Sequence, residues 1–311
     1  MADQFVYECK LSPDLQEKAK RELNETPETR EECLKKLYET VRARPELVCP
    51  TDPIFLLGFL RARKFDLDRA IKLLENWCRV RTSISELYDD YGPAGIKDLL
   101  AAGLFTSLPS RDQDGRKVII LRLGKWDVKK FSIYDTFKPG LLANDLMLRD
   151  EETQINGITA IMDLGGMTMQ HVTQFGPRVA MKVSPLVNDD CAPFRMKSFN
   201  IVNESGFFAT MYAIGKPFMK EKMKQRMHVH GEDLTNLHKQ ITSSILPPEY
   251  GGSGPSIDDT SKEWVDYVMS KEKELLAMKE YGLKESKLGQ KEVDDAATME
   301  GTVGTFKKLD I

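Results

Sequence analysis

The chain has 311 residues, of which 41% are hydrophobic and 30% are charged, and this composition allows a sizeable buried core. Its formal net charge of -3 argues against general nucleic-acid binding, so an anionic partner must be met by a local basic patch. Its five cysteines include no C-x-x-C pair, which argues against a disulfide framework and a zinc site.

The N-terminal sequence MADQFVYECK lacks the basic and apolar regions of a secretory signal. No stretch approaches the roughly 20 apolar residues that a bilayer span requires. The scattered cysteines also fit a reducing compartment. We therefore expect a cytoplasmic protein that associates transiently with membranes and does not cross them.

Residues 1–90 are expected to form an N-terminal helical domain. Ser12-Pro13-Asp14 and Thr51-Asp52-Pro53 each combine an N-cap residue with a proline that is favourable in the first helical turn. After Asp66, apolar residues recur at helical spacing, at Leu67, Ala70, Ile71, Leu74 and Trp77. These segments predict a small helical bundle.

From the turn signal Asp114-Gly115 onward, the pattern changes to short β-rich runs at 117–123, 157–163, 198–203 and 227–230. Segments with helical periodicity separate these runs, at about 133–151, 168–186 and 205–226. Strand, helix and strand in repetition predict an α/β fold whose mainly parallel sheet occupies a second domain, residues 91–254.

The C-terminal part, residues 255–311, is rich in charged residues of both signs. One helix is predicted at about 262–281. The last 25 or so residues are expected to be mobile, because they carry little apolar material that could drive ordering.

The stretch 207–231, FFATMYAIGKPFMKEKMKQRMHVHG, places an apolar face next to a series of basic residues. Apolar residues share one helix face before Pro217, and methionines recur every four residues after it: Phe207, Met211, Ile214 and Phe218, then Met219, Met223 and Met227. This layout is typical of a helix at a membrane interface, where basic side chains reach the headgroups. The alternative is an ordinary amphipathic helix that covers a core.

The sequence lacks the common motifs of catalysis and cofactor binding. The turn after the second strand run reads DLGGM, which is neither a G-x-G-x-x-G nor a Walker A loop, and no G-x-S-x-G elbow is present. His228 and His230 are expected to point to opposite faces of a strand and so not to hold a metal by themselves. We predict no catalytic residue, no cofactor and no metal site.

Five strings occur in order along the chain: FLLGFLRARKFDLDRAIKLLENW, DGRKVIILRLGKWD, NGITAIMDLGG, KPFMKEKMKQRMHVHG and ILPPEYGG. In this order and spacing the chain resembles the CRAL-TRIO lipid-binding family, whose members include carriers of tocopherol and of retinaldehyde. The resemblance implies a helical bundle followed by a βαβ sheet that forms the floor of a deep apolar pocket. It also implies that residues 205–226 form a mobile helical gate over this pocket.

The resemblance further implies which residues line the pocket: Phe137, Gly140, Asn144, Ile158, Met162, Val183, Leu186, Val187, Phe194, Met196, Phe199, Phe207, Met211 and Ile214. A tocopherol-binding relative has small hydroxyl residues at the positions of Gly140 and Asn144, so the ligand is left open. Asn144 offers both a donor and an acceptor to a hydroxyl or carbonyl head. The same residues would equally fit an ordinary core.

The phosphoinositide-contacting residues of the family correspond here to Arg63, Arg195, Lys197, Lys222 and Arg226. All five are basic, but the middle pair is reversed relative to the tocopherol-binding relative. This reversal moves the planar guanidinium, which can bind a phosphate through two parallel hydrogen bonds. For Arg63, a salt bridge within the helical bundle is the alternative.

The residues and the resemblance together predict a non-enzymatic carrier of a small hydrophobic lipid, such as a retinoid, a tocopherol or a carotenoid. The carrier is expected to transfer this ligand between membranes, with release assisted by a membrane surface that contains phosphoinositide. The alternative is a lipid-regulated adaptor that docks on partners in membrane trafficking. No nucleic-acid partner is expected.

Overall fold

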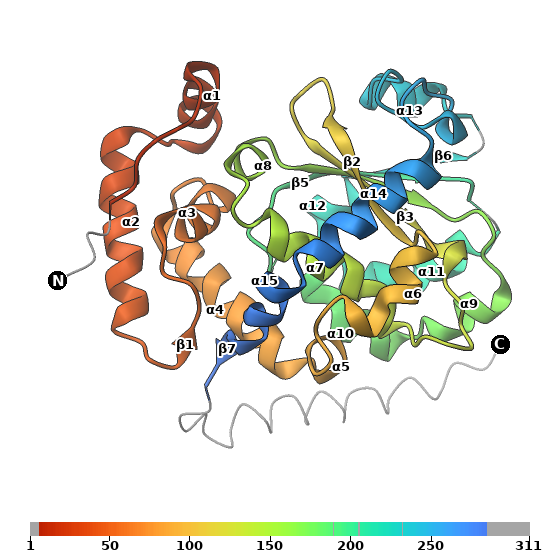
Figure 1. The fold of residues 1–311 in the computed structure, drawn as a ribbon, viewed down its shortest axis with the longest axis horizontal. Coiled ribbons are helices and arrows are strands. Elements are labelled where there is room, and N and C mark those ends of the chain that lie inside the picture. Colours follow the sequence, from red (N-terminus) through yellow and green to blue (C-terminus); the bar gives the residue numbers. More distant parts are fainter. Residues whose placement is uncertain (1–5, 189, 205, 232, 285–311) are drawn as a thin grey trace.

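The computed structural model describes residues 6–188, 190–204, 206–231 and 233–284. N-terminal helices pack beside a five-stranded sheet, and the last described helices run back across that sheet toward the N-terminal helices (Figure 1). The predicted α/β architecture, a helical region followed by a mainly parallel sheet, is confirmed. Within the described ranges, no helix is both long and apolar enough to cross a membrane.

Two N-terminal helices begin at predicted capping residues, Ser12 and Asp52, and a third begins at Asp66, which was not predicted as a cap. Ser12 Oγ accepts a hydrogen bond from the backbone amide of Leu15 at 3.3 Å, and Asp52 and Asp66 cap two later helices in the same way. The helices of this region are α1 (Pro13–Leu23), α2 (Pro27–Arg42), α3 (Pro53–Ala62), α4 (Leu67–Ser83) and α5 (Ser85–Tyr88).

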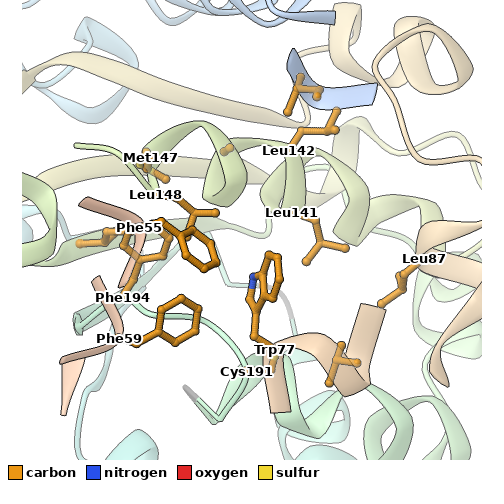
Figure 2. Close-up of a cluster of buried hydrophobic side chains, with 14 of the residues drawn as sticks. Phe55, Phe59, Trp77, Leu87, Leu141, Leu142, Met147, Leu148, Cys191 and Phe194 are labelled. Carbon is orange, nitrogen blue, oxygen red and sulfur yellow. The ribbon is translucent and has the colours of Figure 1, made fainter. Parts of the chain in front are cut away.

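The helical region and the sheet region share one hydrophobic core. The rings of Phe55 and Phe59 in α3 have centroids 5.0 Å apart, and Trp77 of α4 lies 5.3 Å from Phe55. Figure 2 shows these rings in one cluster with Leu148 and Phe194, which belong to the sheet region. The two regions are therefore joined by buried apolar contacts.

The five strands lie in the order β2-β3-β4-β5-β6, with β2 antiparallel to β3 and the other neighbours parallel. The four predicted strand runs correspond to β3 to β6. The edge strand β2 was not predicted, since its sequence FTSLPSR contains a proline and alternates poorly. The bounds are Phe105–Arg111 (β2), Lys117–Arg122 (β3), Ile158–Asp163 (β4), Met196–Val202 (β5) and Met227–Gly231 (β6).

The two faces of the sheet bury different side chains. Val118 and Ile120 of β3 pack with residues of α13, whereas Ile119 between them joins the main core. The helices of the sheet region are α6 (Lys97–Ala101), α7 (Lys138–Met147), α8 (Glu151–Asn156), α9 (Met169–Gln174), α10 (Pro177–Val187), α11 (Phe208–Gly215), α12 (Glu221–Lys224) and α13 (Thr235–Gln240).

Two segments that were predicted as single helices are divided. The segment 133–151 forms a short 3-10 helix and then α7, and α8 begins separately after Asp150, whose carboxylate accepts from the Thr153 amide at 3.2 Å. The segment 168–186 is divided into α9 and α10, because Pro177 starts a new first turn after Gly176.

The C-terminal segment packs onto both preceding regions. Its first helix, α14 (Ile257–Ser270), begins after the capping residue Ser256, earlier than the predicted residue 262. After α15 (Glu272–Ala277), strand β7 (Gly282–Leu283) pairs antiparallel with β1 (Leu47–Val48) of the helical region. The last 25 or so residues, which were expected to be mobile, lie outside the described residues.

The shared core can be tested by removing one of its rings. Phe59 is 0% exposed, so Phe59→Ala should lower the free energy of unfolding by about 3–5 kcal/mol, because the lost ring leaves a cavity. Urea denaturation followed by circular dichroism measures this loss. Val229→Ala, at a residue 47% exposed, is the matched control. A loss below about 1 kcal/mol at Phe59 would contradict the shared core.

Candidate functional site

An apolar surface forms on one face of the sheet. Ile158 of β4 lies opposite Met196 of β5, and Ala160 lies opposite Phe199. Alternation along β4 directs Met162 to the same face as Ile158. Four of the predicted ligand-binding residues therefore share one face of two adjacent parallel strands.

Residues of α7, α10 and the loop before β5 add to this surface. Phe137 and Leu186 are partly buried and pack against the main core, and Phe194 is buried within it. A Cβ added at Gly140 would meet Phe105 Cε2 at 3.8 Å, an ordinary contact, so packing does not require a glycine there. The remaining predicted positions on these helices are Asn144 and Val187, which are half-buried, and Val183, which is buried.

Asn144 is the polar residue among the predicted ligand-binding positions. Within the described part of the chain, the side-chain amide of Asn144 makes no hydrogen bond. The next residue, Asp145, is engaged elsewhere, since it accepts hydrogen bonds from Arg81 at 2.9 Å and from Tyr91. The Asn144 amide therefore remains available to a ligand head.

The predicted gate contains an apolar helix that the rest of the molecule leaves partly exposed. Helix α11, FATMYAIG, has no buried residue, and it contacts α10. Phe207 and Met211 pack with Met162 and Ile201 in a small cluster, and Ile214 is half-buried. A helix that is apolar on all sides is normally buried, so the exposure of α11 is unusual.

The gate segment, predicted to be helical over 205–226, is interrupted by a non-helical turn, and residue 205 lies outside the described residues. Helix α11 ends at Gly215, Pro217 lies in a 3-10 turn, and Met219 is extended with ψ of 133°. The predicted helical stripe of methionines is therefore wrong. Met223 is only 1% exposed, and Met227 is the first residue of β6.

Asn188, which sequence reasoning missed, holds the turn between α11 and α12. Its Nδ2 donates to the Phe218 carbonyl at 2.7 Å, and its Oδ1 accepts from the Lys220 amide at 2.8 Å. The side chain of Lys220 also pairs with Asp190. No sequence pattern signals these contacts, because the partners lie about one helix and one strand apart along the chain.

Two of the five predicted phosphoinositide-binding residues meet at one carboxylate. Arg195 Nη2 donates to Glu22 Oε2 of α1 at 3.1 Å, and Lys197 Nζ lies 3.6 Å from the same oxygen. Arg195 also donates to the carbonyl of Ile155 at 2.6 Å. An internal acid therefore neutralises part of this basic pair.

Burial, reinforced by the neighbouring charge of Arg195, lowers the pKa of Lys197 to about 8, although Glu22 acts in the opposite direction. Burial acts to raise the pKa of Glu22, but the hydrogen bond from Arg195 and the charge of Lys197 outweigh it and lower that pKa. The acid is therefore ionised while the lysine is poorly stabilised as a cation.

The other three basic residues lie on different elements. Arg226 precedes β6, and its carbonyl accepts from the Phe199 amide at 2.8 Å, which places it beside the strand that carries Lys197. Lys222 is exposed on α12. Arg63 follows α3, where its guanidinium donates to the Ala62 carbonyl at 3.2 Å. The phosphoinositide assignment stays a prediction.

The prediction that His228 and His230 point to opposite faces is wrong. Residues two apart on a strand share a face, and the two rings are stacked with centroids 6.5 Å apart. His230 Nε2 and Asn200 Oδ1 form a hydrogen bond of 2.9 Å. Among the described residues, no group of three or more metal-ligating side chains is found here or elsewhere.

Three cavities, of about 310, 560 and 190 Å³, are each lined by none of the predicted ligand-binding residues. The predicted binding surface is therefore defined by the shared sheet face and the cluster at α11. In this structure, Phe207 and Met211 pack in the same apolar cluster as Met162.

Residues 102–252 match the family model described as CRAL/TRIO domain, and residues 26–95 match the model described as Pinta-like, UBA domain. The chain is 40% identical over 253 residues to Alpha-tocopherol transfer protein-like of Homo sapiens, across 81% of this chain and 74% of that protein. The chain belongs to the CRAL/TRIO family. The CRAL/TRIO match includes all five strands of the sheet together with α7, α10 and α11.

Two further relatives and one solved structure are similar to this CRAL/TRIO protein. Alpha-tocopherol transfer protein-like of Mus musculus is 38% identical over 271 residues, across 87% of this chain and 78% of that protein. Clavesin-2 of Homo sapiens is 33% identical over 251 residues, across 80% of this chain and 76% of that protein. A solved structure titled Crystal structure of Sfh5 aligns with a TM-score of 0.46 and 15% identity, over 79% of this chain and 98% of that one.

The lowered pKa of Lys197 predicts a pH dependence of stability. Between about pH 8 and the ordinary value of 10.5, the unfolded chain binds a proton that the folded protein has released. This group therefore adds stability as the pH rises, by about 1 kcal/mol between pH 7.5 and 9.5 after allowance for partial exposure.

The comparison variant for this prediction is Lys197→Arg, because arginine stays protonated throughout the range. Urea denaturation of both proteins at the two pH values should show a larger gain for the wild type. Parallel gains in the two proteins would show that Lys197 carries no shifted pKa.

Proposed function

We propose that this protein is a non-enzymatic carrier, which holds a small hydrophobic lipid against the apolar face of its sheet and transfers it between membranes. The observation that carries this proposal is the apolar helix α11, which lies without a buried residue in a CRAL/TRIO domain. Burial of such a helix against a ligand on one side and a bilayer on the other offsets the cost of its exposure to water.

The ligand class follows from the surface and from the relatives. The predicted positions are apolar apart from Asn144, so an extended hydrocarbon chain with one hydroxyl or carbonyl group is the best match. Relatives at 38% to 40% identity carry names that refer to tocopherol transfer. A tocopherol or a comparable prenyl or polyene lipid is therefore the proposed ligand.

The basic residues are proposed to meet a phosphorylated headgroup at the acceptor membrane. Arg195 and Lys197 are held by Glu22 in this structure. A phosphoinositide headgroup carries more negative charge than one carboxylate and more acceptor oxygens, so it is a stronger partner for this pair. Lys222 and Arg226 connect this patch to the gate, because Lys222 lies on α12, just after the turn that follows α11, and Arg226 lies between α12 and β6.

Filling the proposed pocket should prevent ligand retention. Met162→Trp adds a large ring where Met162 meets Phe207 and Met211, and the overpacking should cost about 1–3 kcal/mol of stability. Native mass spectrometry after incubation with α-tocopherol, and separately with retinal, measures occupancy. The control Val229→Trp places the same ring at an exposed position of β6 and should retain ligand. Equal occupancy in both variants would remove Met162 from the site.

Transfer to acceptor vesicles tests the proposed function as a whole. Wild-type protein loaded with α-tocopherol should deliver it faster to phosphatidylcholine vesicles that contain phosphoinositide than to vesicles without it. Lys222→Ala combined with Arg226→Ala should load normally and lose this acceleration. The acceleration should also weaken at high salt, because exposed charges are screened beyond about 8 Å at physiological ionic strength.

Lys262→Ala combined with Lys273→Ala is the matched control, because it neutralises two exposed charges on the C-terminal helices. Loss of acceleration in both double variants would mean that overall charge governs the effect. Ligand binding without any transfer between vesicles would favour the lipid-regulated adaptor over the carrier.

A further inference from the structure

A carboxylate of α1 occupies the basic pair at the start of β5. Glu22 Oε2 accepts a hydrogen bond from Arg195 Nη2 at 3.1 Å and lies 3.6 Å from Lys197 Nζ. One oxygen therefore faces both cations, as an oxygen of a bound phosphate would. The side chains of Arg195 and Lys197 are only 13% and 24% exposed, so little of either cation is open to an external anion while Glu22 is in place.

Two cations share this one carboxylate. Among the described residues, Glu22 is the only acid that pairs with Arg195 or Lys197. Lys18, one turn earlier on α1, adds a third positive charge near Glu22, and its amine donates to the Asp114 carbonyl at 2.8 Å. Glu22 therefore leaves positive charge over, which favours a partner with a larger negative charge. A phosphate monoester, with about −1.5 to −2 charges at pH 7, is such a partner.

The packing of α1 holds the Glu22 carboxylate beside the pair. Before Glu22, Ala19 is 1% exposed and packs with Ile155 of α8, and Figure 1 shows these two helices next to each other. After Glu22, the carboxylate of Glu25 accepts hydrogen bonds from the buried guanidinium of Arg61 at 2.8 Å. Because the chain is anchored on both sides, the Glu22 carboxylate is presented to the two cations at a high effective concentration.

We propose that Glu22 is an autoinhibitory group, which occupies the position of a headgroup phosphate and must leave before that phosphate binds Arg195 and Lys197. This inference rests on the proposed function, since it takes the pair to bind a phosphoinositide. Rotation of the Glu22 side chain frees the pair while α1 stays packed. An internal competitor lowers the affinity for every external anion by the same factor. Only a headgroup of high intrinsic affinity, such as a multiply phosphorylated inositol, therefore binds.

Glu22→Gln tests this competition in the full-length protein, because the amide removes the charge and keeps an acceptor for Arg195. Cosedimentation measures binding to phosphatidylcholine vesicles with and without phosphatidylinositol bisphosphate. Glu22→Gln should bind the bisphosphate vesicles about fivefold more tightly than wild type, which is the scale of one charge near an anionic surface. Soluble inositol trisphosphate should show a similar gain, because the competition concerns the phosphate and not the lipid chains. Glu22→Ala, which also removes the charge, should behave like Glu22→Gln.

Two further variants separate competition from general charge repulsion. Glu17→Gln removes an exposed negative charge from the same helix and should gain much less affinity than Glu22→Gln. Arg195→Gln combined with Lys197→Gln removes the two charges for which Glu22 competes. Adding Glu22→Gln to this double variant should then change the affinity for bisphosphate vesicles by less than about twofold. A full gain in that background, or an equal gain in Glu17→Gln, would overturn the proposal.

Failure of this inference is distinguishable from failure of the proposed function. If wild type and Glu22→Gln bind the bisphosphate vesicles equally, phosphoinositide binding stands and the inhibitory role of Glu22 is overturned. If neither protein distinguishes these vesicles from phosphatidylcholine alone, phosphoinositide recognition fails and the inference is overturned with it. Tighter binding that requires both the loss of the Glu22 charge and the presence of Arg195 and Lys197 supports the inference.

Discussion

The buried guanidinium of Arg61 is the contact on which the joining of the two regions depends. Its side chain is 0% exposed and donates to both carboxylate oxygens of Glu25 at 2.8 Å, to Glu151 at 2.8 Å and to Gln154 at 2.6 Å. Burial opposes the charged form, yet Glu25 and Glu151 outweigh it and raise the pKa of Arg61. Because a buried charge is tolerated only when it is fully paired, α8 has to stay close to α3 and to the turn after α1.

A glycine in α3 leaves room for the side chains that surround Arg61. A Cβ at position 58 would meet the Gln154 amide at 3.2 Å, so Gly58 leaves room for the side chain that bonds Arg61. A second buried arginine, Arg81, connects α4 with Asp145 of α7 and with the Met278 carbonyl of the C-terminal segment. With these two arginines and the β1–β7 pair, the helical region is attached at several points, which fixes the position of α7.

Local chemistry explains which parts of the fold could be predicted. The caps at Ser12 and Asp52 and the four parallel strands follow from short patterns, since each depends on a few neighbouring residues. The edge strand β2 was not predicted, because its residues alternate poorly and its conformation is determined by its pairing with β3. The break in the gate segment has two causes. Pro217 could be recognised from the sequence, whereas the contacts of Asn188 with this turn are indicated by no local pattern.

In the candidate site, too, features set by local sequence could be predicted and features set by distant contacts could not. The apolar residues on β4 and β5 could be placed on one face from alternation and resemblance. The neutralisation of Arg195 and Lys197 by Glu22 could not be foreseen, because these partners are separated by more than half of the chain and meet only when α1 packs near β5.

The double contact of Asn188 couples the two sides of the turn between α11 and α12. One amide group both donates and accepts, and its two backbone partners flank Met219 on opposite sides of the turn. A small displacement of this turn weakens both hydrogen bonds together, because both end on the same side chain. A partly displaced turn therefore keeps little of the hydrogen-bond energy. Water must replace both hydrogen bonds before the turn can move. The proposed movement of α11 is then expected to be a two-state event that requires the detachment of Asn188.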